Sequence, residues 1–358
     1  MKEKEMTVLH VCDYAANYRG NFIESLESLE TYHSNVRNVY LFPARAKNTN
    51  ARTWIAQMNT TDQVAYIQEE SFIKNILLFR NIIKTHKVDR IVRHFSDLHI
   101  DIIIKILFNP KKVVRFFHCG YRPVPGSLKA RIRRFLWKHN RLVGVSVAMA
   151  DEVKRALPDF EVIPIVNAIE FDRLDVIEPF EKPDKTTMLI MGWDKERKGV
   201  DLAALACERL QSKYDLELMI VGGSKETEVK DYVRKTLGKT VDWVRFLPPT
   251  NNIGTYYNAT DIFLSPSRQE AFGYAVVEAA YRKCSVVLTK VDGQGQIQLD
   301  GAYWFESEDL DGFVEQLEKA ILERNTPQRI AQREEVCKQA VERYSLKTWS
   351  NKLIEILQ

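Results

Sequence analysis

Two glutamates are the residues of this chain whose types and spacing best suit ligand chemistry. Glu270 and Glu278 are separated by seven residues in the segment Glu-Ala-Phe-Gly-Tyr-Ala-Val-Val-Glu. The segment follows a strand-like Ile262–Ser265 and leads into a helical pattern over 275–282. Glu270 is therefore expected in the connection, and Glu278 one to two turns into the helix. A loop carboxylate, a Phe-Gly pair and free helix-start amides can together hold a molecule that carries both hydroxyl and phosphate groups.

A second segment places two cations between a strand pattern and a helix pattern. Arg197 and Lys198 follow the apolar run Met188–Met191 and precede the helical stretch 200–211. A helix N-terminus favours an anion, and two basic side chains beside it add to that preference. We therefore expect a diphosphate group to bind at Arg197 and Lys198.

The segment from Glu270 to Glu278, with the Ser-Pro-Ser before it and the Val-Val strand after it, resembles the Glu-x7-Glu motif of retaining glycosyltransferases of family 4. These enzymes have the GT-B fold, and the bacterial members that build cell-surface glycans are the type we expect here. The resemblance implies that Glu270 is catalytic and that it holds the donor sugar with the backbone of Phe272 and Gly273. It also implies that Glu278 binds the ribose of the nucleotide.

Other segments match this family in part. Lys198 matches a lysine that clamps the nucleotide diphosphate together with an arginine. Trp193 stands where that arginine is expected, so Arg197 is the candidate substitute. In the first half, Gly20 matches a glycine whose amide faces the donor phosphates, and His118 matches a histidine near the transferred sugar. A lone histidine is as often structural as functional, so both interpretations of His118 stay open.

The elements that must position these residues alternate between strand and helix. The alternation covers the first half of the chain and restarts after Asp184, which predicts two domains with mostly parallel sheets. We therefore expect an α/β protein of the GT-B type, with two facing Rossmann-like doubly wound domains and a central cleft. The expected parts are an N-terminal domain, a linker, a C-terminal nucleotide-sugar-binding domain and, by resemblance, a helix that returns to the N-terminal domain: 1–168, 169–187, 188–340 and 341–358.

Composition argues against several other kinds of protein. Five scattered cysteines without a Cys-x-x-Cys pair disfavour disulfides and zinc sites, and they favour a reducing compartment. Asp309 and Asp311 match the Asp-x-Asp of metal-dependent glycosyltransferases, but they precede the amphipathic stretch 313–322 and are interpreted as a helix N-cap. No metal or cofactor is therefore expected. The longest apolar run is too short for a membrane span and no secretory signal is recognised, so we expect a cytoplasmic protein.

Basic residues are concentrated in the first half of the chain. Residues 1–165 carry 26 Lys and Arg against 16 Asp and Glu. Helical periodicity over Ser127–Arg141 places Trp137 among the charges and four apolar residues toward the core, namely Leu128, Ile132, Phe135 and Leu136. A basic face with an exposed aromatic suits peripheral contact with an anionic membrane. A solvated face and a nucleic-acid contact are the alternatives, and the absence of a nucleic-acid-binding motif disfavours the second.

These observations predict a metal-independent retaining glycosyltransferase. It would move a sugar from a nucleoside-diphosphate sugar to a hydroxyl of a glycan, which we expect to be lipid-linked, in surface polysaccharide synthesis. Two alternatives stay open. Trp193, and Ala168 where the family has a glycine, favour an inactive GT-B-like subunit that binds acceptor for a catalytic partner, while a nucleotide-sugar epimerase of the same fold would act on the donor alone. The sequence does not specify the nucleotide base, the transferred sugar, the acceptor, the linkage or the oligomeric state.

Overall fold

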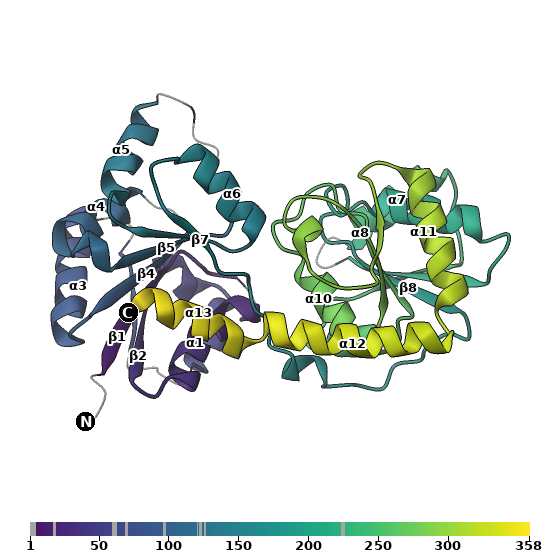
Figure 1. Cartoon of the computed structure of the whole chain (residues 1–358), viewed down its shortest axis with the longest axis horizontal. Helices are drawn as coiled ribbons and strands as arrows, with labels where there is room; N and C mark the ends of the chain where they lie inside the picture. Colours follow the sequence, from purple (N-terminus) through teal and green to yellow (C-terminus); the bar gives the residue numbers. More distant parts are fainter. Residues whose placement is uncertain are drawn as a thin grey trace. The chain divides into compact units, whose positions relative to one another are not determined.

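The computed structural model describes residues 5–16, 19–58, 63–68, 71–95, 98–119, 121, 124, 127–222 and 226–358. The chain forms two compact units, each with helices packed on a parallel sheet (Figure 1). Unit 1 comprises Met1–Ala168 and Leu346–Gln358, and unit 2 comprises Ile169–Ser345. The expected α/β class with two Rossmann-like units is confirmed. The stretch 169–187, expected as a linker, belongs to unit 2.

The sheet of unit 1 has the strand order β3-β2-β1-β4-β5-β6-β7, and its neighbouring strands are parallel. The strands are β1 Met6–Cys12, β2 Val36–Phe42, β3 Val64–Tyr66, β4 Arg90–His94, β5 Val113–Phe117, β6 Arg141–Gly144 and β7 Val162–Pro164. Because the strands run in one direction, the segments that follow β1, β4 and β5 meet at one edge of the sheet. This arrangement brings Gly20, His94 and His118 to the same edge.

The helices of unit 1 are α1 Gly20–Tyr32, α2 Ala51–Ala56, α3 Phe72–Thr85, α4 Leu98–Leu107, α5 Leu128–Trp137, α6 Val147–Ala156 and α13 Leu346–Leu357. Helix α13 comes from the far end of the chain and packs beside α1 (Figure 1). The guanidinium of Arg90 holds its last turn, since Nε donates to the Leu357 carbonyl at 2.5 Å. Helices α3 and α4 cover the sheet with buried apolar residues that include Phe79, Ile82, Ile100, Ile103 and Ile104.

The sheet of unit 2 has the order β10-β9-β8-β11-β12-β13 and is also parallel. Its strands are β8 Thr186–Met191, β9 Leu216–Val221, β10 Val244–Leu247, β11 Ile262–Ser265, β12 Ser285–Thr289 and β13 Tyr303–Phe305. Its helices are α7 Val200–Leu210, α8 Glu226–Leu237, α9 Gly254–Asn258, α10 Tyr274–Tyr281, α11 Leu310–Glu323 and α12 Pro327–Tyr344. Glu278 lies in the second turn of α10, as the sequence predicted.

Side-chain caps start several helices where the sequence offers a short polar residue. Ser127 accepts a hydrogen bond from Ala130 N–H at the start of α5 at 3.2 Å, and Thr326 caps α12 just before Pro327. Asp309 accepts from Gly312 N–H at 2.9 Å at the start of α11. The interpretation of the Asp309 segment as an N-cap is therefore confirmed.

Helix α5 is only partly oriented as expected over Ser127–Arg141, because Leu136 is buried as predicted but three other residues are placed differently. Trp137 is fully buried, and its indole Nε1 donates to Asp101 Oδ2 at 2.8 Å. Leu128 and Phe135, expected in the core, are 71% and 67% exposed. The buried carboxylate of Asp101, which also accepts from Arg115 at 2.7 Å, provides the partner that draws the indole inward. Among the described residues, no helix is long and apolar enough to cross a bilayer.

Candidate active site

The region around Glu270 lies at the carboxyl ends of β8 and β11 in unit 2. One loop, 192–199, joins β8 to α7, and a second loop, 266–273, joins β11 to α10. Each helix is preceded by a glycine with positive φ and no side-chain cap, Gly199 at 69° and Gly273 at 96°. The first-turn amides of α7 and α10 therefore lie at this edge of the sheet, where they can serve an anion.

Gly199 lets the two loops approach each other closely. A Cβ on Gly199 would lie 2.1 Å from the carbonyl oxygen of Pro266, a distance that excludes any side chain. The loops are also joined by a backbone hydrogen bond, in which Arg268 N–H donates to the Arg197 carbonyl at 2.8 Å. Close loop packing therefore places positions 197 and 198 beside position 270.

Lys198 and Glu270 form the central contact of the site. Lys198 Nζ lies 2.5 Å from Glu270 Oε2, and the two side chains are 12% and 14% exposed. Arg197 Nη1 lies 3.6 Å from the same oxygen. Arg197 Nε also donates to Asp194 Oδ2 at 2.6 Å, and Nη1 donates to the Gln269 carbonyl at 3.0 Å. Two cations thus share one carboxylate at the edge where two helices begin.

Arg268 connects the loop 266–273 to the loop 192–199 and to the start of α7. Its guanidinium makes two hydrogen bonds to the Asp201 carboxylate, at 2.9 and 2.8 Å, and one to the Glu196 carbonyl at 2.5 Å. It also pairs with Glu308 at 2.5 Å. The hydrogen bonds to Asp201 are the main reason that the pKa of Arg268 is raised. Arg268 therefore ties the start of α7 to the loop that carries Glu270.

The space beside the Lys198–Glu270 pair is small. Lys198, Glu270 and Gly273 line a cavity of about 10 Å³ together with residues of β8, β11 and α10. That volume holds about one water molecule. This cavity is therefore too small to hold a phosphate or sugar group.

Glu278 is buried and already has partners within unit 2. Arg173 forms an ion pair with its Oε1, and the Tyr257 hydroxyl donates to its Oε2 at 3.0 Å. Burial and the adjacent Glu278 carboxylate raise the pKa of Tyr257, so its hydroxyl keeps the proton that it donates. Arg173 and Tyr257 therefore hold the Glu278 carboxylate in place within unit 2.

Two further side chains of the site have distinct surroundings. Phe272 is buried, and its ring packs edge-on against Tyr344 of α12 with centroids 5.6 Å apart. Its backbone, rather than its side chain, remains the candidate ligand contact. Trp193 is 53% exposed, and its ring centroid lies 5.1 Å from Arg197 Cζ and 5.5 Å from Lys198 Nζ. The residue that replaces the expected arginine therefore supports the two cations through cation–π contacts.

His118 follows β5 in unit 1 and belongs to a cluster of rings. His118 Nε2 lies 3.1 Å from His94 Nδ1, which makes a hydrogen bond in one direction or the other. The ring of Phe95 stacks on His118 with centroids 4.5 Å apart, and Phe22 meets it edge-on at 5.2 Å. Phe22 lies in the first turn of α1, whose first residue is Gly20 with a φ of 63°. The cluster therefore joins His118 to the start of α1.

The histidines of this cluster are neutral at pH 7. Burial lowers the pKa of His118 to about 3 and that of His10, one strand away in the sheet from His94, to about 4. Burial lowers the pKa of His94 as well, with smaller contributions from the neighbouring His118, His10 and Arg93. A neutral imidazole donates one hydrogen bond and accepts another. His118 can therefore contact hydroxyl groups but does not supply a positive charge.

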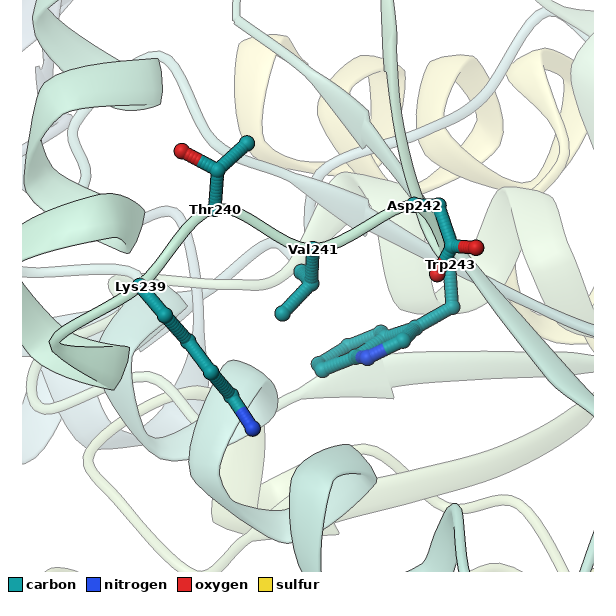
Figure 2. Close-up of a pocket in the computed structure, with 5 residues that line it drawn as sticks. All are labelled: Lys239, Thr240, Val241, Asp242 and Trp243. Carbon is teal, nitrogen blue, oxygen red and sulfur yellow. The ribbon is translucent and has the colours of Figure 1, made fainter.

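Other features of the described chain suit a ligand less well. A surface concavity of about 630 Å³ is lined by Lys239, Thr240, Val241, Asp242 and Trp243 (Figure 2). These residues precede β10, so they lie at the amino edge of the sheet, opposite the edge that carries Glu270. Among the described residues, no group of three or more His, Cys, Asp and Glu side chains is arranged to hold a metal ion.

Comparison with known proteins finds a family match within unit 2. Residues 173–336 match the family model of glycosyl transferases group 1. This stretch is therefore similar to group 1 glycosyltransferase domains. It contains the Lys198–Glu270 pair and Glu278, so the cluster described above lies inside the matched stretch.

Two curated relatives that match about half of this chain bear informative names. The chain is 30% identical over 190 residues to one subunit of the human phosphatidylinositol N-acetylglucosaminyltransferase, a match that covers 51% of this chain and 39% of that protein. It is 25% identical over 167 residues to the lipopolysaccharide core biosynthesis glycosyltransferase LpsE of Rhizobium meliloti, covering 46% and 47%. The chain thus spans less than half the length of each relative.

Solved structures resemble the chain over nearly its whole length. A glycosyltransferase from Rickettsia africae has a TM-score of 0.81 at 17% identity, over 99% of this chain and 98% of that chain. HepE from Anabaena, in complex with UDP and glucose, has a TM-score of 0.73 at 16% identity, over 99% of both chains. At these identities the likeness establishes the fold of both units.

Sequence reasoning missed several partners of the site residues. Arg173 and Tyr257 hold Glu278, Arg268 holds the loops, and His94 contacts His118. Arg268 lies only two residues before Glu270, so its place next to the motif was the one available signal. Arg173 lies 105 positions from Glu278, and no local pattern marks such a pair.

Proposed function

We propose that this chain is a retaining glycosyltransferase that moves a sugar from a nucleoside-diphosphate sugar to a hydroxyl group of a lipid-linked or other glycan acceptor. The cluster of Lys198, Arg197 and Glu270 at the starts of α7 and α10 carries this proposal. LpsE and the human N-acetylglucosaminyltransferase are named for lipopolysaccharide and phosphatidylinositol, which supports a lipid-bearing acceptor. We place the reaction in the synthesis of a cell-surface polysaccharide.

The proposed donor site uses the chemistry of each residue in the cluster. Lys198, Arg197 and the helix-start amides bind the diphosphate, because all of them present N–H donors or positive charge at one edge. Glu270 accepts hydrogen bonds from the sugar, with the backbone of Phe272 and Gly273 beside it. Glu278 accepts from the ribose. The complex of HepE with UDP and glucose supports a donor that contains a nucleoside diphosphate.

Bond breaking makes the diphosphate more negative as it leaves the sugar. Lys198 and Arg197 are held by Glu270, Asp194 and the loop backbone before the reaction begins. Groups fixed in advance stabilise developing charge without reorganising, and a single such contact is commonly worth a factor of about 100 to 1000 in rate. The leaving group is therefore stabilised mainly by this chain's own cations and amides.

Unit 1 is proposed as the acceptor side. Its His118 is neutral, so it serves the sugar or the acceptor as a hydrogen-bonding group rather than as a cation. Gly20 begins α1 with positive φ, which lets the backbone amides there approach phosphate oxygens. Both residues lie at the carboxyl edge of their sheet, the edge at which parallel α/β sheets bind ligands.

A panel of UDP-, GDP- and ADP-sugars tests the function directly. We expect one donor to be consumed when a hydroxylated acceptor is present, and we expect Glu270→Gln to abolish that turnover. Glu315→Gln, an exposed residue of α11, is the matched control and is expected to leave turnover unchanged. Conversion of the donor into another nucleotide sugar without any acceptor would identify an epimerase. Failure to bind any donor would identify an inactive acceptor-binding protein, as Trp193 and Ala168 suggest.

A peripheral membrane contact is the second part of the proposal. The membrane surface consists of exposed apolar residues and cations on α4, α5 and the segment before α5: Ile106, Val124, Leu128, Lys129, Arg131, Phe135 and Lys138. The four apolar members are 62–71% exposed. Lys105 Nζ of α4 lies 5.3 Å from the Phe135 ring, so the two helices join in one surface. Apolar side chains surrounded by cations suit a bilayer that contains anionic lipids.

Vesicle sedimentation tests the membrane surface. The chain is expected to bind vesicles of phosphatidylcholine with phosphatidylglycerol and to lose most of that binding in Leu128→Ser with Phe135→Ser. Leu322→Ser is the control, since Leu322 is 63% exposed but lies in unit 2. Equal loss in the control, or binding to an RNA oligonucleotide but not to vesicles, contradicts the membrane contact.

A further inference from the structure

We propose that Glu270 masks Lys198 and Arg197 when no donor is bound, and that this masking makes the site prefer an intact nucleotide sugar over a bare nucleoside diphosphate. The inference rests on the proposed function, because it assigns a regulatory consequence to the same site. Glu270 then has two partners in turn. It pairs with the cations in the ligand-free chain and with sugar hydroxyls in the donor complex.

The ion pair closes the position at which a diphosphate has to bind. Lys198 Nζ and Glu270 Oε2 are 2.5 Å apart, and the cavity beside them holds only about 10 Å³. Both side chains are less than 15% exposed, so water screens the pair weakly. An incoming diphosphate therefore competes with the carboxylate for Lys198 and is repelled by the carboxylate's own charge.

The loops that carry the pair are fixed, so Glu270 has little freedom to move away. The Glu270 carbonyl accepts from Gly293 N–H at 2.9 Å. A Cβ on Gly293 would lie 1.8 Å from the Ala271 carbonyl oxygen, which shows how tightly the next segment packs on this loop. Arg268 holds the opposite loop through Asp201. After Lys198 turns to a ligand, the Glu270 carboxylate thus stays nearby and needs a new partner.

The two ligands differ in whether they supply that partner. A nucleotide sugar brings hydroxyl groups that donate to the Glu270 carboxylate, so the broken ion pair is replaced. A bare nucleoside diphosphate has only its ribose hydroxyl groups, which the proposed function places at Glu278, so the partly buried Glu270 carboxylate is left beside a second negative group. The site therefore favours the substrate over the nucleotide product, which speeds product release.

Calorimetric titration of the full chain tests the masking without the true donor. The probes are inorganic pyrophosphate, UDP, GDP and ADP. Glu270→Gln keeps the side-chain shape and removes the charge, and we expect it to bind pyrophosphate about five- to tenfold more tightly than wild type, as expected for release of one partly buried ion pair. Glu270→Ala is expected to change affinity in the same direction. Glu315→Gln, which removes a charge elsewhere in unit 2, is expected to change it less than about twofold.

A double-mutant cycle locates the effect. In a Lys198→Gln background, the gain from Glu270→Gln is expected to shrink to about twofold or less, because the masked cation is gone. With the donor panel, the ratio of affinities for UDP-glucose over UDP, GDP-mannose over GDP or ADP-glucose over ADP is expected to fall in Glu270→Gln.

The outcomes separate the masking from the proposed function. Equal or weaker pyrophosphate binding by Glu270→Gln, or an equal gain in Glu315→Gln, overturns the masking but does not contradict the proposed transferase function of the wild-type chain. Tighter pyrophosphate binding without turnover of any donor supports the masking and contradicts the transferase. No binding of any probe to either protein overturns both.

Discussion

The predicted site regions of the two units differ in charge. The site histidines of unit 1 are neutral, whereas the site residues of unit 2 form ion pairs. In unit 1, His118 and His94 lie among aromatic rings, and burial keeps them neutral at pH 7. In unit 2, Lys198, Arg197 and Glu270 satisfy one another as ion pairs at the starts of two helices. All seven histidines of the chain precede Asn140, so unit 2 has carboxylates and cations but no imidazole.

This difference suggests a division of tasks within the proposed reaction. An anion needs positive charge and amides, which unit 2 supplies. A hydroxyl acceptor needs groups that accept or donate a hydrogen bond without a strong field, which a desolvated imidazole supplies. The comparison can be tested by changing one region at a time.

The largest effect is expected at the cationic cluster. Lys198→Gln removes the charge nearest Glu270, so we expect kcat/KM for the nucleotide sugar to fall by about 100- to 1000-fold. Lys319→Gln, on the exposed face of α11 in the same unit, is the control and is expected to have no effect. Steady-state kinetics decide this. A loss of less than about threefold in Lys198→Gln means that unit 2 does not stabilise the leaving group as proposed.

The second effect concerns the close approach of the two loops. Gly199→Ala is expected to cost about 3 kcal/mol in the free energy of unfolding, because its Cβ would meet the Pro266 carbonyl. Gly238 has the same φ of 69°, and nothing lies within 4 Å of the position that a Cβ would take there, so Gly238→Ala is expected to cost only about 1 kcal/mol. Denaturant unfolding measures both. Equal losses of stability in the two variants would show that the positive φ alone, and not the contact between the loops, makes glycine necessary at position 199.

The third prediction concerns the dependence of stability on pH. The folded chain lowers the pKa of His10 from 6.5 to about 4, so the unfolded chain binds more protons between these values. Stability from His10 is therefore complete above pH 6.5 and falls as the pH drops toward 4, by roughly 2–3 kcal/mol at pH 4.5. Hydrogen exchange read separately in each unit is expected to show this loss in unit 1.

Two controls accompany the pH experiment. His10→Asn is expected to reduce the pH dependence of unit 1 by the contribution of His10 and to leave the contributions of His94 and His118, whose pKa values burial also lowers. His139→Asn is expected to leave it unchanged, since His139 is exposed. Unit 2 contains no histidine, so a loss of equal size in its exchange over the same pH range would contradict the assignment of the effect to the buried rings.

The smallest effect is expected where an arginine ties the loops together. Arg268→Gln breaks a two-bond contact with Asp201 between side chains that are 30% and 20% exposed, and about 1–2 kcal/mol of stability is expected to be lost. Arg234→Gln breaks an exposed pair with Asp231 and is expected to cost less than about 0.5 kcal/mol. Thermal unfolding of the two variants compares them. An equal cost in both would mean that Arg268 does not hold the site loops.

Much of the architecture could be predicted because short stretches of sequence determine it. The apolar runs around Met188–Met191 and Ile262–Ser265 lie where strands β8 and β11 form, and the expected helix over 275–282 is α10 displaced by one residue. The turn chemistry before α11 was also local, since Asp309 and the amide that it caps are three residues apart. Strand and helix periods depend on consecutive residues, which is why these predictions succeeded.

Helix α5 shows where local reasoning fails. Periodicity identified an amphipathic helix and placed Leu136 correctly, but it misplaced Phe135 and Trp137. Both residues are aromatic, and the pattern does not show which one finds a partner. The partner is Asp101 on α4, itself fully buried within an apolar stretch. The exposed residues that resulted, Leu128 and Phe135, take the place of Trp137 as the apolar part of the proposed membrane surface.

The sequence alone determined that two parallel-sheet units would form, and that Glu270 and Lys198 would each follow a strand and lie near the start of a helix. Only the tertiary structure decided which charges meet: Lys198 with Glu270 across 72 residues, Arg173 with Glu278 across 105 residues, and Asp101 with Trp137. The physical reason is that periodicity is a property of neighbours in the chain. Ion pairs and buried hydrogen bonds depend on strand order and loop packing, which bring distant residues together.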